Sequence, residues 1–133
     1  MARAGLDKNA VVERAAQLAN EVGIDHIQLK TLAESLNIQP PSLYHHIRGL
    51  DDLHHELMLY GWRHMEERML EAMGSSDGYA AWESVCWAFY RYATENPGVF
   101  SAMLWYNKYR DDETQSVTEE LFTMCFKIAS SLN

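Results

Sequence analysis

Apolar residues recur at intervals of three and four along most of the chain, and no stretch of useful length alternates as a half-buried β-strand would. In residues 8–22 this spacing predicts an amphipathic helix that Asp7 caps and Gly23 ends. Its apolar face consists of Val12, Ala15, Ala16, Ala19 and Val22. The pattern as a whole predicts an all-α fold.

The segment Gln28–Leu53 predicts two short helices joined by a tight turn. The apolar face of the first has the spacing i, i+3, i+4 and i+7, with Leu29, Leu32, Ala33 and Leu36. Asn37 suits the left-handed position of the turn, because its side chain hydrogen-bonds locally. The second helix, residues 42–47, has Leu43 and Ile47 one turn apart, facing the core. This is the helix-turn-helix arrangement that places one helix in the DNA major groove.

A long helix is predicted next, over residues 51–73, with Gly74–Gly78 as the clearest linker in the chain. We therefore divide the sequence into a helix-turn-helix DNA-binding head, residues 1–50, and a helical body, residues 51–133.

Three helices are predicted after the linker. The first ends near residue 95, where Asn96 is placed to cap the second and Pro97 to occupy its first position. The apolar face of the second consists of Phe100, Met103 and Leu104. The third follows Asp112, and the sequence stops within its apolar pattern without a clear terminator. We therefore expect the helical body to be truncated at its C-terminus.

The formal net charge of −8 narrows the function classes. Residues 1–48 carry five basic and five acidic groups, so the whole deficit lies beyond Arg48. A neutral head on an acidic body argues against a general nucleic-acid coat protein, which needs strong non-specific affinity. It leaves a sequence-specific DNA reader open.

Compartment and membrane association follow from the apolar and cysteine positions. No run approaches the roughly 20 apolar residues needed to span a bilayer, and the first ten residues lack the apolar segment of a signal peptide. Cys86 and Cys125 lie in apolar helical patterns, so we predict reduced core thiols, with a disulfide as the alternative. We expect a cytoplasmic protein without membrane association.

Several elements of the head stand at characteristic distances from one another: Gly23, the pair Leu32-Ala33, and the run Leu43–Ile47 followed by Asp51-Asp52-Leu53. In these elements the chain resembles the tetracycline-repressor (TetR) family of bacterial transcriptional regulators, and Trp82–Phe100 resembles the family more weakly. The resemblance implies an all-α homodimer whose heads enter successive major grooves and whose body binds an inducer.

Two positions depart from the family pattern. Gln28 stands where a Ser or Thr usually caps the second helix, so we expect a weaker helix start. Leu50 stands where many members carry a Lys that touches a phosphate, so we expect one DNA contact fewer.

The predicted DNA-binding group lies on and beside the second helix of the helix-turn-helix. Gln39 and Ser42 carry groups that hydrogen-bond base edges, and Pro41 can pack on a thymine methyl. The phosphate contacts are assigned to Tyr44, His46, Lys30 and Arg48. The complete group is Lys30, Gln39, Pro41, Ser42, Tyr44, His45, His46 and Arg48. The alternative is that these are ordinary solvated polar residues.

The body is rich in aromatic and methionine residues, most of which we assign to the core, because stripes at helical spacing usually lie there. The resemblance also implies a pocket between the helices of the body, suited to a small apolar or aromatic effector. The predicted lining residues are Trp82, Phe89, Phe100, Met103 and Trp105.

All six histidines fall between His26 and His64, and His54, His55, Asp51, Asp52 and Glu56 suggest a zinc site as an alternative. Adjacent histidines on a helix point about 100° apart and no HExxH-like pair is present, so we predict no metal. The chain shows no nucleophile motif, phosphate loop or cofactor fingerprint. We expect no enzyme activity, no catalytic residue and no cofactor.

The sequence therefore predicts a ligand-responsive bacterial repressor. It would bind a pseudo-palindromic double-stranded operator as a homodimer and be released by a small effector. The first alternative is a helical protein-interaction module without DNA binding. The second, which the residue pattern favours less, is a histidine-cluster metal protein.

Overall fold

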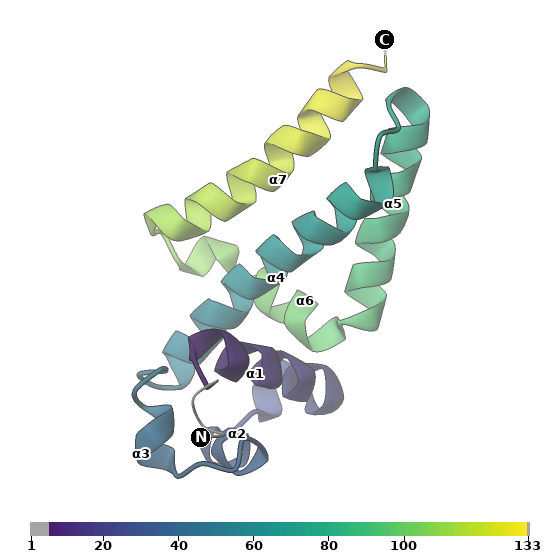
Figure 1. The fold of residues 1–133 in the computed structure, drawn as a ribbon. Helices are drawn as coiled ribbons and strands as arrows, with labels where there is room; N and C mark the ends of the chain where they lie inside the picture. Colours follow the sequence, from purple (N-terminus) through teal and green to yellow (C-terminus); the bar gives the residue numbers. More distant parts are fainter. Residues whose placement is uncertain (1–5, 133) are drawn as a thin grey trace.

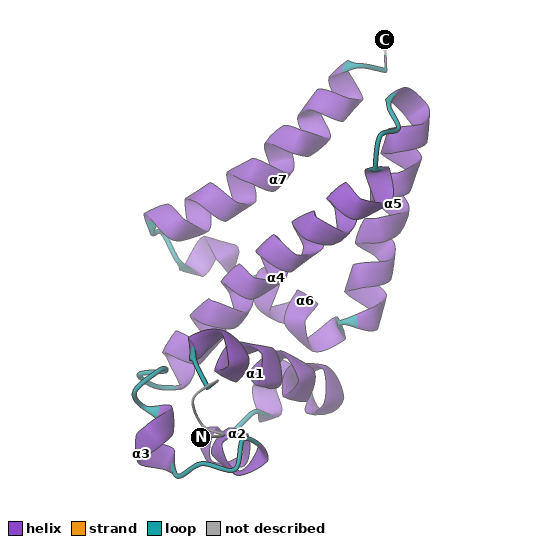
Figure 2. Cartoon of the chain, in the orientation of Figure 1, coloured by secondary structure: helices purple, strands orange, loops and turns teal. Residues whose placement is uncertain are grey.

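The computed structural model describes residues 6–132, which form helices joined by loops and include no strand (Figure 2). The helices are α1 (Lys8–Val22), α2 (Leu29–Ser35), α3 (Pro40–Leu43), α4 (Leu50–Met73), α5 (Gly78–Glu95), α6 (Pro97–Met103) and α7 (Asp112–Ser130), with the 3₁₀ turns η2 (Ile24–His26) and η3 (Tyr106–Lys108). The predicted all-α fold is confirmed. Among the described residues, no helix has the length and apolar character needed to cross a bilayer.

Local signals set the ends of α1 as predicted. Asp7 Oδ1 accepts a hydrogen bond from the Ala10 N–H at 2.9 Å, which supplies a partner to a free amide of the first turn. Gly23 ends the helix with a φ of 92°, a backbone conformation that glycine adopts without steric strain. Both ends of α1 therefore depend on residues that the sequence identifies directly.

The long helix α4 forms the axis of the molecule (Figure 1). The helices α1–α3 gather at its N-terminal end, α5 and α7 pack along it, and α6 contacts both α4 and α1. One continuous buried cluster joins these elements, with members such as Val11, Leu57, Val85, Val99 and Leu121. The head and the body of the chain therefore share a core.

Helices α4 and α6 approach closely at Gly61. A Cβ atom at this position would lie 2.7 Å from Met103 Sδ and 2.9 Å from Val99 Cγ1, closer than real contacts allow. Beside it, the Trp62 indole N–H donates a hydrogen bond to the Met103 carbonyl at 3.2 Å. A residue without a side chain thus allows α6 to sit directly on α4.

The second helix of the helix-turn-helix differs from the predicted residues 42–47. The α-helix begins at Pro40 and ends at Leu43, and Tyr44–His46 continue as turns. The His45 and His46 N–H groups bond carbonyls three residues back, at 3.3 and 2.9 Å. Prolines at the first two positions carry no N–H, so they fit the first turn of the helix at no hydrogen-bond cost.

Two predictions of burial in the body are wrong. Leu104, assigned to the apolar face of α6, is 61% exposed and is the C-cap residue of that helix. Cys86, assigned to the core, is an exposed free thiol on α5. Cys125 is a half-buried free thiol, and burial raises its pKa. The disulfide alternative is not formed.

We predicted that most aromatic residues of the body are buried in the core. Several of them are exposed. Trp62 and Tyr92 are buried, but α5 exposes Tyr79, Trp87, Phe89 and Tyr90, and α7 exposes Phe122 and Phe126. Helical spacing alone does not distinguish an apolar face covered by this chain from one left open.

Candidate nucleic-acid interface

The segment from Gln39 to Arg48 presents polar side chains on the outside of the head. Leu43 and Ile47 are fully buried and anchor the segment in the shared core. Their neighbours point away from the core: Tyr44 is 51% exposed and the Arg48 side chain is 89% exposed. The segment therefore combines an apolar anchor with outward groups that hydrogen-bond or carry charge.

The turn between α2 and α3 has the geometry of a Schellman motif. Asn37 occupies its left-handed position, with a φ of 59°. The Ile38 N–H donates to the Ala33 carbonyl at 3.0 Å, and the Asn37 N–H donates to the Glu34 carbonyl at 3.0 Å. The predicted left-handed Asn37 is confirmed, and it sets the angle at which α3 leaves α2.

A carboxylate closes the other end of the segment. Asp52, in the first turn of α4, accepts a hydrogen bond from the Arg48 backbone N–H at 3.0 Å. The same carboxylate lies 3.9 Å from the Arg48 guanidinium. The guanidinium end of this long contact is exposed and contributes little stability, so the guanidinium can exchange its partner for a phosphate.

The structure brings the predicted DNA-binding residues to the surface of the head. Lys30, Gln39, Pro41, Ser42, Tyr44, His45 and Arg48 are exposed, and His46 is half-buried. Within residues 6–132, the Gln28 side chain makes no capping hydrogen bond to α2, as its departure from the family pattern predicted. Leu50 begins α4 and is also exposed, so an apolar group stands at this edge of the surface.

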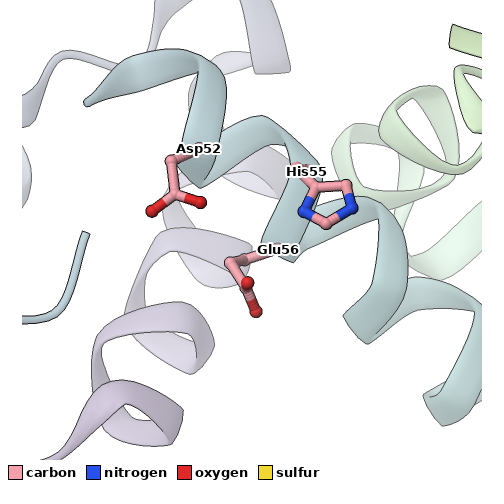
Figure 3. Close-up of side chains that lie close together, drawn as sticks. All are labelled: Asp52, His55 and Glu56. Carbon is pink, nitrogen blue, oxygen red and sulfur yellow. The ribbon is translucent and has the colours of Figure 1, made fainter. Parts of the chain in front are cut away.

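Three potential metal ligands lie on one side of the first turns of α4: Asp52, His55 and Glu56 (Figure 3). One ligand atom from each lies within 4.8 Å of the others. Each already faces another group, namely the Arg48 N–H at 3.0 Å, Asp111 at 2.7 Å and Lys8 at 2.9 Å, respectively. The cluster is thus a set of polar contacts that joins the start of α4 to α1 and α7.

Asp111 also caps α7. Its Oδ1 accepts a hydrogen bond from the Thr114 N–H at 2.7 Å. Hydrogen bonding from Thr114 lowers the pKa of Asp111 below its usual value, and the nearby His55 lowers it further. This carboxylate therefore stays ionised at neutral pH, where it contacts His55 of α4.

The five predicted effector-lining residues fall into separate environments. The Phe89 and Phe100 rings lie edge to face, with centroids 5.9 Å apart, and join α5 to α6. Met103 is buried against α4, and Trp82 is half-buried on α5. Trp105 packs at 5.1 Å on the His54 ring, near the head. Of the five predicted lining residues, the structure thus brings Phe89 and Phe100 into contact with each other and places the other three elsewhere.

None of those five residues lines the grooves between α4 and its neighbours α7 and α5. An open groove of about 720 Å³ lies between α4 and α7. A second, of about 650 Å³, lies between α4 and α5 and is lined in part by His64, Arg68, Arg91 and Tyr92. The sequence did not lead us to predict these polar lining residues, although His64 and Arg68 stand one turn apart on α4.

The second groove contains a polar pair that bridges its two helices. His64 Nδ1 lies 3.1 Å from the Tyr92 hydroxyl, and the Tyr60 ring packs against the imidazole at 5.0 Å. Burial lowers the pKa of His64, and the nearby Arg68 lowers it further. The imidazole is therefore neutral at physiological pH, and the pair forms a polar floor between α4 and α5.

The fold and the outward polar segment together define an all-α protein of the helix-turn-helix class. Comparison with known proteins narrows the class. The chain is similar to the uncharacterized HTH-type transcriptional regulator YobS of Bacillus subtilis, with 32% identity over 126 residues. The match covers 95% of this chain and 65% of YobS, so the chain spans about two thirds of that relative.

Tetracycline repressors match shorter stretches of the chain at higher identity. Over 44 residues the chain is 46% identical to the class A repressor from transposon 1721 of Escherichia coli, covering 33% of this chain and 20% of that protein. Over 57 residues it is 44% identical to the class G repressor of Vibrio anguillarum, covering 41% of this chain and 27% of that protein. The chain belongs to the TetR family of transcriptional regulators.

Solved structures share the fold. The TetR-family regulator PfmR of Thermus thermophilus matches with a TM-score of 0.68 and 22% identity, over 90% of this chain and 68% of PfmR. A Rhodococcus protein of unknown function matches with a TM-score of 0.82 and 15% identity, over 96% of this chain and 68% of that one. No protein-family model matches the sequence.

Proposed function

We propose that the intact protein is a cytoplasmic, ligand-responsive transcriptional repressor that binds a pseudo-palindromic DNA operator as a homodimer. Residues 1–50 would read DNA, and residues 51–133 would belong to the effector-binding and dimerisation body. The observation that carries the proposal is the segment from Gln39 to Arg48, in which buried Leu43 and Ile47 hold a row of polar side chains outward. Membership of the TetR family supports it.

In the proposed complex, Gln39 and Ser42 hydrogen-bond base edges and Pro41 packs on a thymine methyl, so these three positions supply the sequence preference. Tyr44 and Arg48, with the other phosphate-binding residues, hold the head in register. Two heads would occupy major grooves about 34–36 Å apart, one turn of the duplex. Because the head carries no net charge, affinity would depend on both heads binding together.

The apolar face of the body supports a second copy as the partner. Aromatic side chains left open on α5 and α7, such as Trp87, Tyr90 and Phe126, form the kind of surface that a subunit contact covers. Light scattering on the intact protein tests this, since a monomer at micromolar concentration would contradict the proposed dimer.

The effector would be a small apolar or aromatic molecule bound in the body. It must bind the conformer that cannot hold DNA more tightly than the other, because equal binding shifts no population. A tilt of α4, which runs from the head into the body, would then change the separation of the two reading segments. Release of the operator in a gel-shift assay by a compound that also raises the melting temperature would identify such an effector.

The DNA-binding proposal is tested by selecting duplexes from a random library with the intact protein and measuring affinity for the selected sequence. Tyr44→Ala is expected to abolish binding while the thermal transition stays nearly unchanged, because the ring is half exposed. Glu21→Ala, an exposed position of α1 outside the reading segment, is the matched control.

A salt titration supplies the second readout. If phosphates contribute to binding, the logarithm of the affinity falls linearly with the logarithm of salt concentration. Full binding by Tyr44→Ala, or an affinity that does not change with salt, would contradict the assignment. The salt-independent result would favour the alternative of a helical protein-interaction module.

A further inference from the structure

Helix α6 begins without the cap that its own sequence offers. Asn96 occupies the N-cap position, as predicted, but within the described residues its side chain makes no hydrogen bond to the first turn. Its amide group instead donates to the Tyr92 carbonyl at 3.1 Å, at the end of α5. Because Pro97 has no N–H, the first amides of α6 that need a partner are those of Gly98 and Val99.

The missing cap comes from α1. Asn20 Oδ1 accepts hydrogen bonds from the Gly98 N–H at 3.0 Å and from the Val99 N–H at 3.1 Å. Asn20 Nδ2 donates a third bond, to Asn96 Oδ1, at 2.9 Å. One side chain of the head thus satisfies the start of a helix of the body that lies 76 to 79 residues later in the chain.

The backbones of the two helices also touch. Gly98 is buried, and a Cβ atom there would overlap the Ala19 carbonyl group and lie 2.8 Å from the Asn20 nitrogen. Ala19 and Val99 are fully buried on either side of this contact. The start of α6 therefore has no free space in which to move relative to the end of α1.

We infer that Asn20 is the positioning residue that couples α6 to the DNA-reading head. At its other end α6 is held by α4, through the contact of Met103 with Gly61 and the hydrogen bond from Trp62. A displacement of α6 by an occupant of the body would therefore reach the head through α1, in parallel with the route through α4. The effect on DNA rests on the proposed function, whereas the coupling itself does not.

Three substitutions separate the parts of this contact. Asn20→Ala removes all three hydrogen bonds and leaves the amides of Gly98 and Val99 without a protein acceptor. Asn20→Asp keeps a carboxylate acceptor for Gly98 and Val99 at the positive end of α6. It also places an acceptor where Asn20 Nδ2 donates to Asn96 Oδ1, so the Asn96 amide must turn its donor towards position 20 and give up its bond to Tyr92. Glu21→Ala changes the exposed neighbour on the same helix and is the matched control.

Hydrogen exchange of the intact protein, followed by NMR, tests the contact directly. In Asn20→Ala the Gly98 and Val99 amides are each expected to exchange about fivefold faster than in the wild type, because each loses one bond that contributes on the order of 1 kcal/mol. Asn20→Asp is expected to restore slow exchange, and Glu21→Ala to leave it unchanged. Wild-type exchange of both amides in Asn20→Ala would overturn the inference.

A double-mutant measurement tests the coupling. Val99→Ala loosens α6 and is expected to speed exchange of the amides in the last turn of α1 when Asn20 is present. In the Asn20→Ala background the same substitution is expected to leave those amides at the rate set by Asn20→Ala alone. Equal additional acceleration in both backgrounds would overturn the coupling through Asn20, because independent sites add.

Operator affinity connects the contact to function. Asn20→Ala is expected to weaken binding of the selected operator at least about fivefold, and Asn20→Asp to restore it, since DNA binding requires correctly placed heads. Equal affinity of Asn20→Ala and wild type would overturn the functional role of Asn20. If the wild-type protein binds no selected duplex, the proposed DNA-reading function fails, while the exchange results still decide the coupling of α1 to α6.

Discussion

Replacing Gly98 by Ala places a methyl group where the backbone of another helix lies. The added Cβ would overlap the Ala19 carbonyl group and lie 2.8 Å from the Asn20 nitrogen. A side chain in the way could change its rotamer, but a helix backbone cannot. In Gly98→Ala the whole first turn of α6 must therefore move away from α1.

The size of the effect follows from three contributions. Overpacking of a filled core costs about 1–3 kcal/mol. Moving α6 weakens the bonds from Gly98 and Val99 to Asn20, each contributing about 0.5–1.5 kcal/mol. The better helix propensity of alanine returns at most about 1 kcal/mol. The net loss is about 2–4 kcal/mol, which corresponds to a decrease in melting temperature of about 6–12 °C for a chain of this size.

Urea and thermal unfolding, followed by circular dichroism, measure this loss. Ser101→Ala, at an exposed position of the same helix, is the matched control and is expected to change stability by no more than about 0.5 kcal/mol. Gly61→Ala should cost less than Gly98→Ala, because its obstacles are the side chains of Met103 and Val99. A Gly98→Ala protein as stable as the wild type would refute the backbone-contact argument.

Two further predictions concern the N-cap of α7 and the stability of the protein at acidic pH. Asp111→Ala removes the N-cap of α7 and is expected to lower the free energy of unfolding by about 0.5–2 kcal/mol in urea unfolding, whereas Asp111→Ser should recover most of this loss. Equal stability of the two variants would contradict a capping role. Burial lowers the pKa of His64 from 6.5, so the unfolded chain binds this proton more readily, and the contribution of neutral His64 is complete above pH 6.5 and declines as the pH falls below it. His64→Gln is therefore expected to lose less stability than the wild type between about pH 7 and pH 5, and parallel declines of the two urea midpoints would contradict this.

Features that depend on neighbouring residues in the chain were accessible from the sequence. The bounds of α1 followed from Asp7 and Gly23, and the left-handed turn followed from Asn37, because capping and turn geometry involve only a few adjacent residues. The alternation of buried Leu43 and Ile47 with outward polar groups followed from helical spacing. Periodicity thus predicted the outward polar side chains of the segment from Gln39 to Arg48 without knowledge of its surroundings.

Features that depend on what covers a helix were not accessible in the same way. Leu104 and Cys86 fit apolar helical patterns, yet both are exposed, because no element within the described residues packs over them. The predicted pocket residues likewise fell into different environments, since α6 directs Phe100 towards α5 and Met103 towards α4. A pattern shows which residues prefer burial, whereas packing decides which of them achieve it.

The sequence by itself determined the all-α class, the helix-turn-helix and its outward residues, because each depends on local propensity or on the helical repeat. Only the tertiary structure showed that Asn20, an ordinary polar residue of α1, caps a helix about 80 residues away. The sequence placed Asn96 correctly at the N-cap, but it could not show that another helix would supply the acceptor. Hydrogen-bond partners distant in sequence are chosen by packing, and here packing brings α6 against the end of α1.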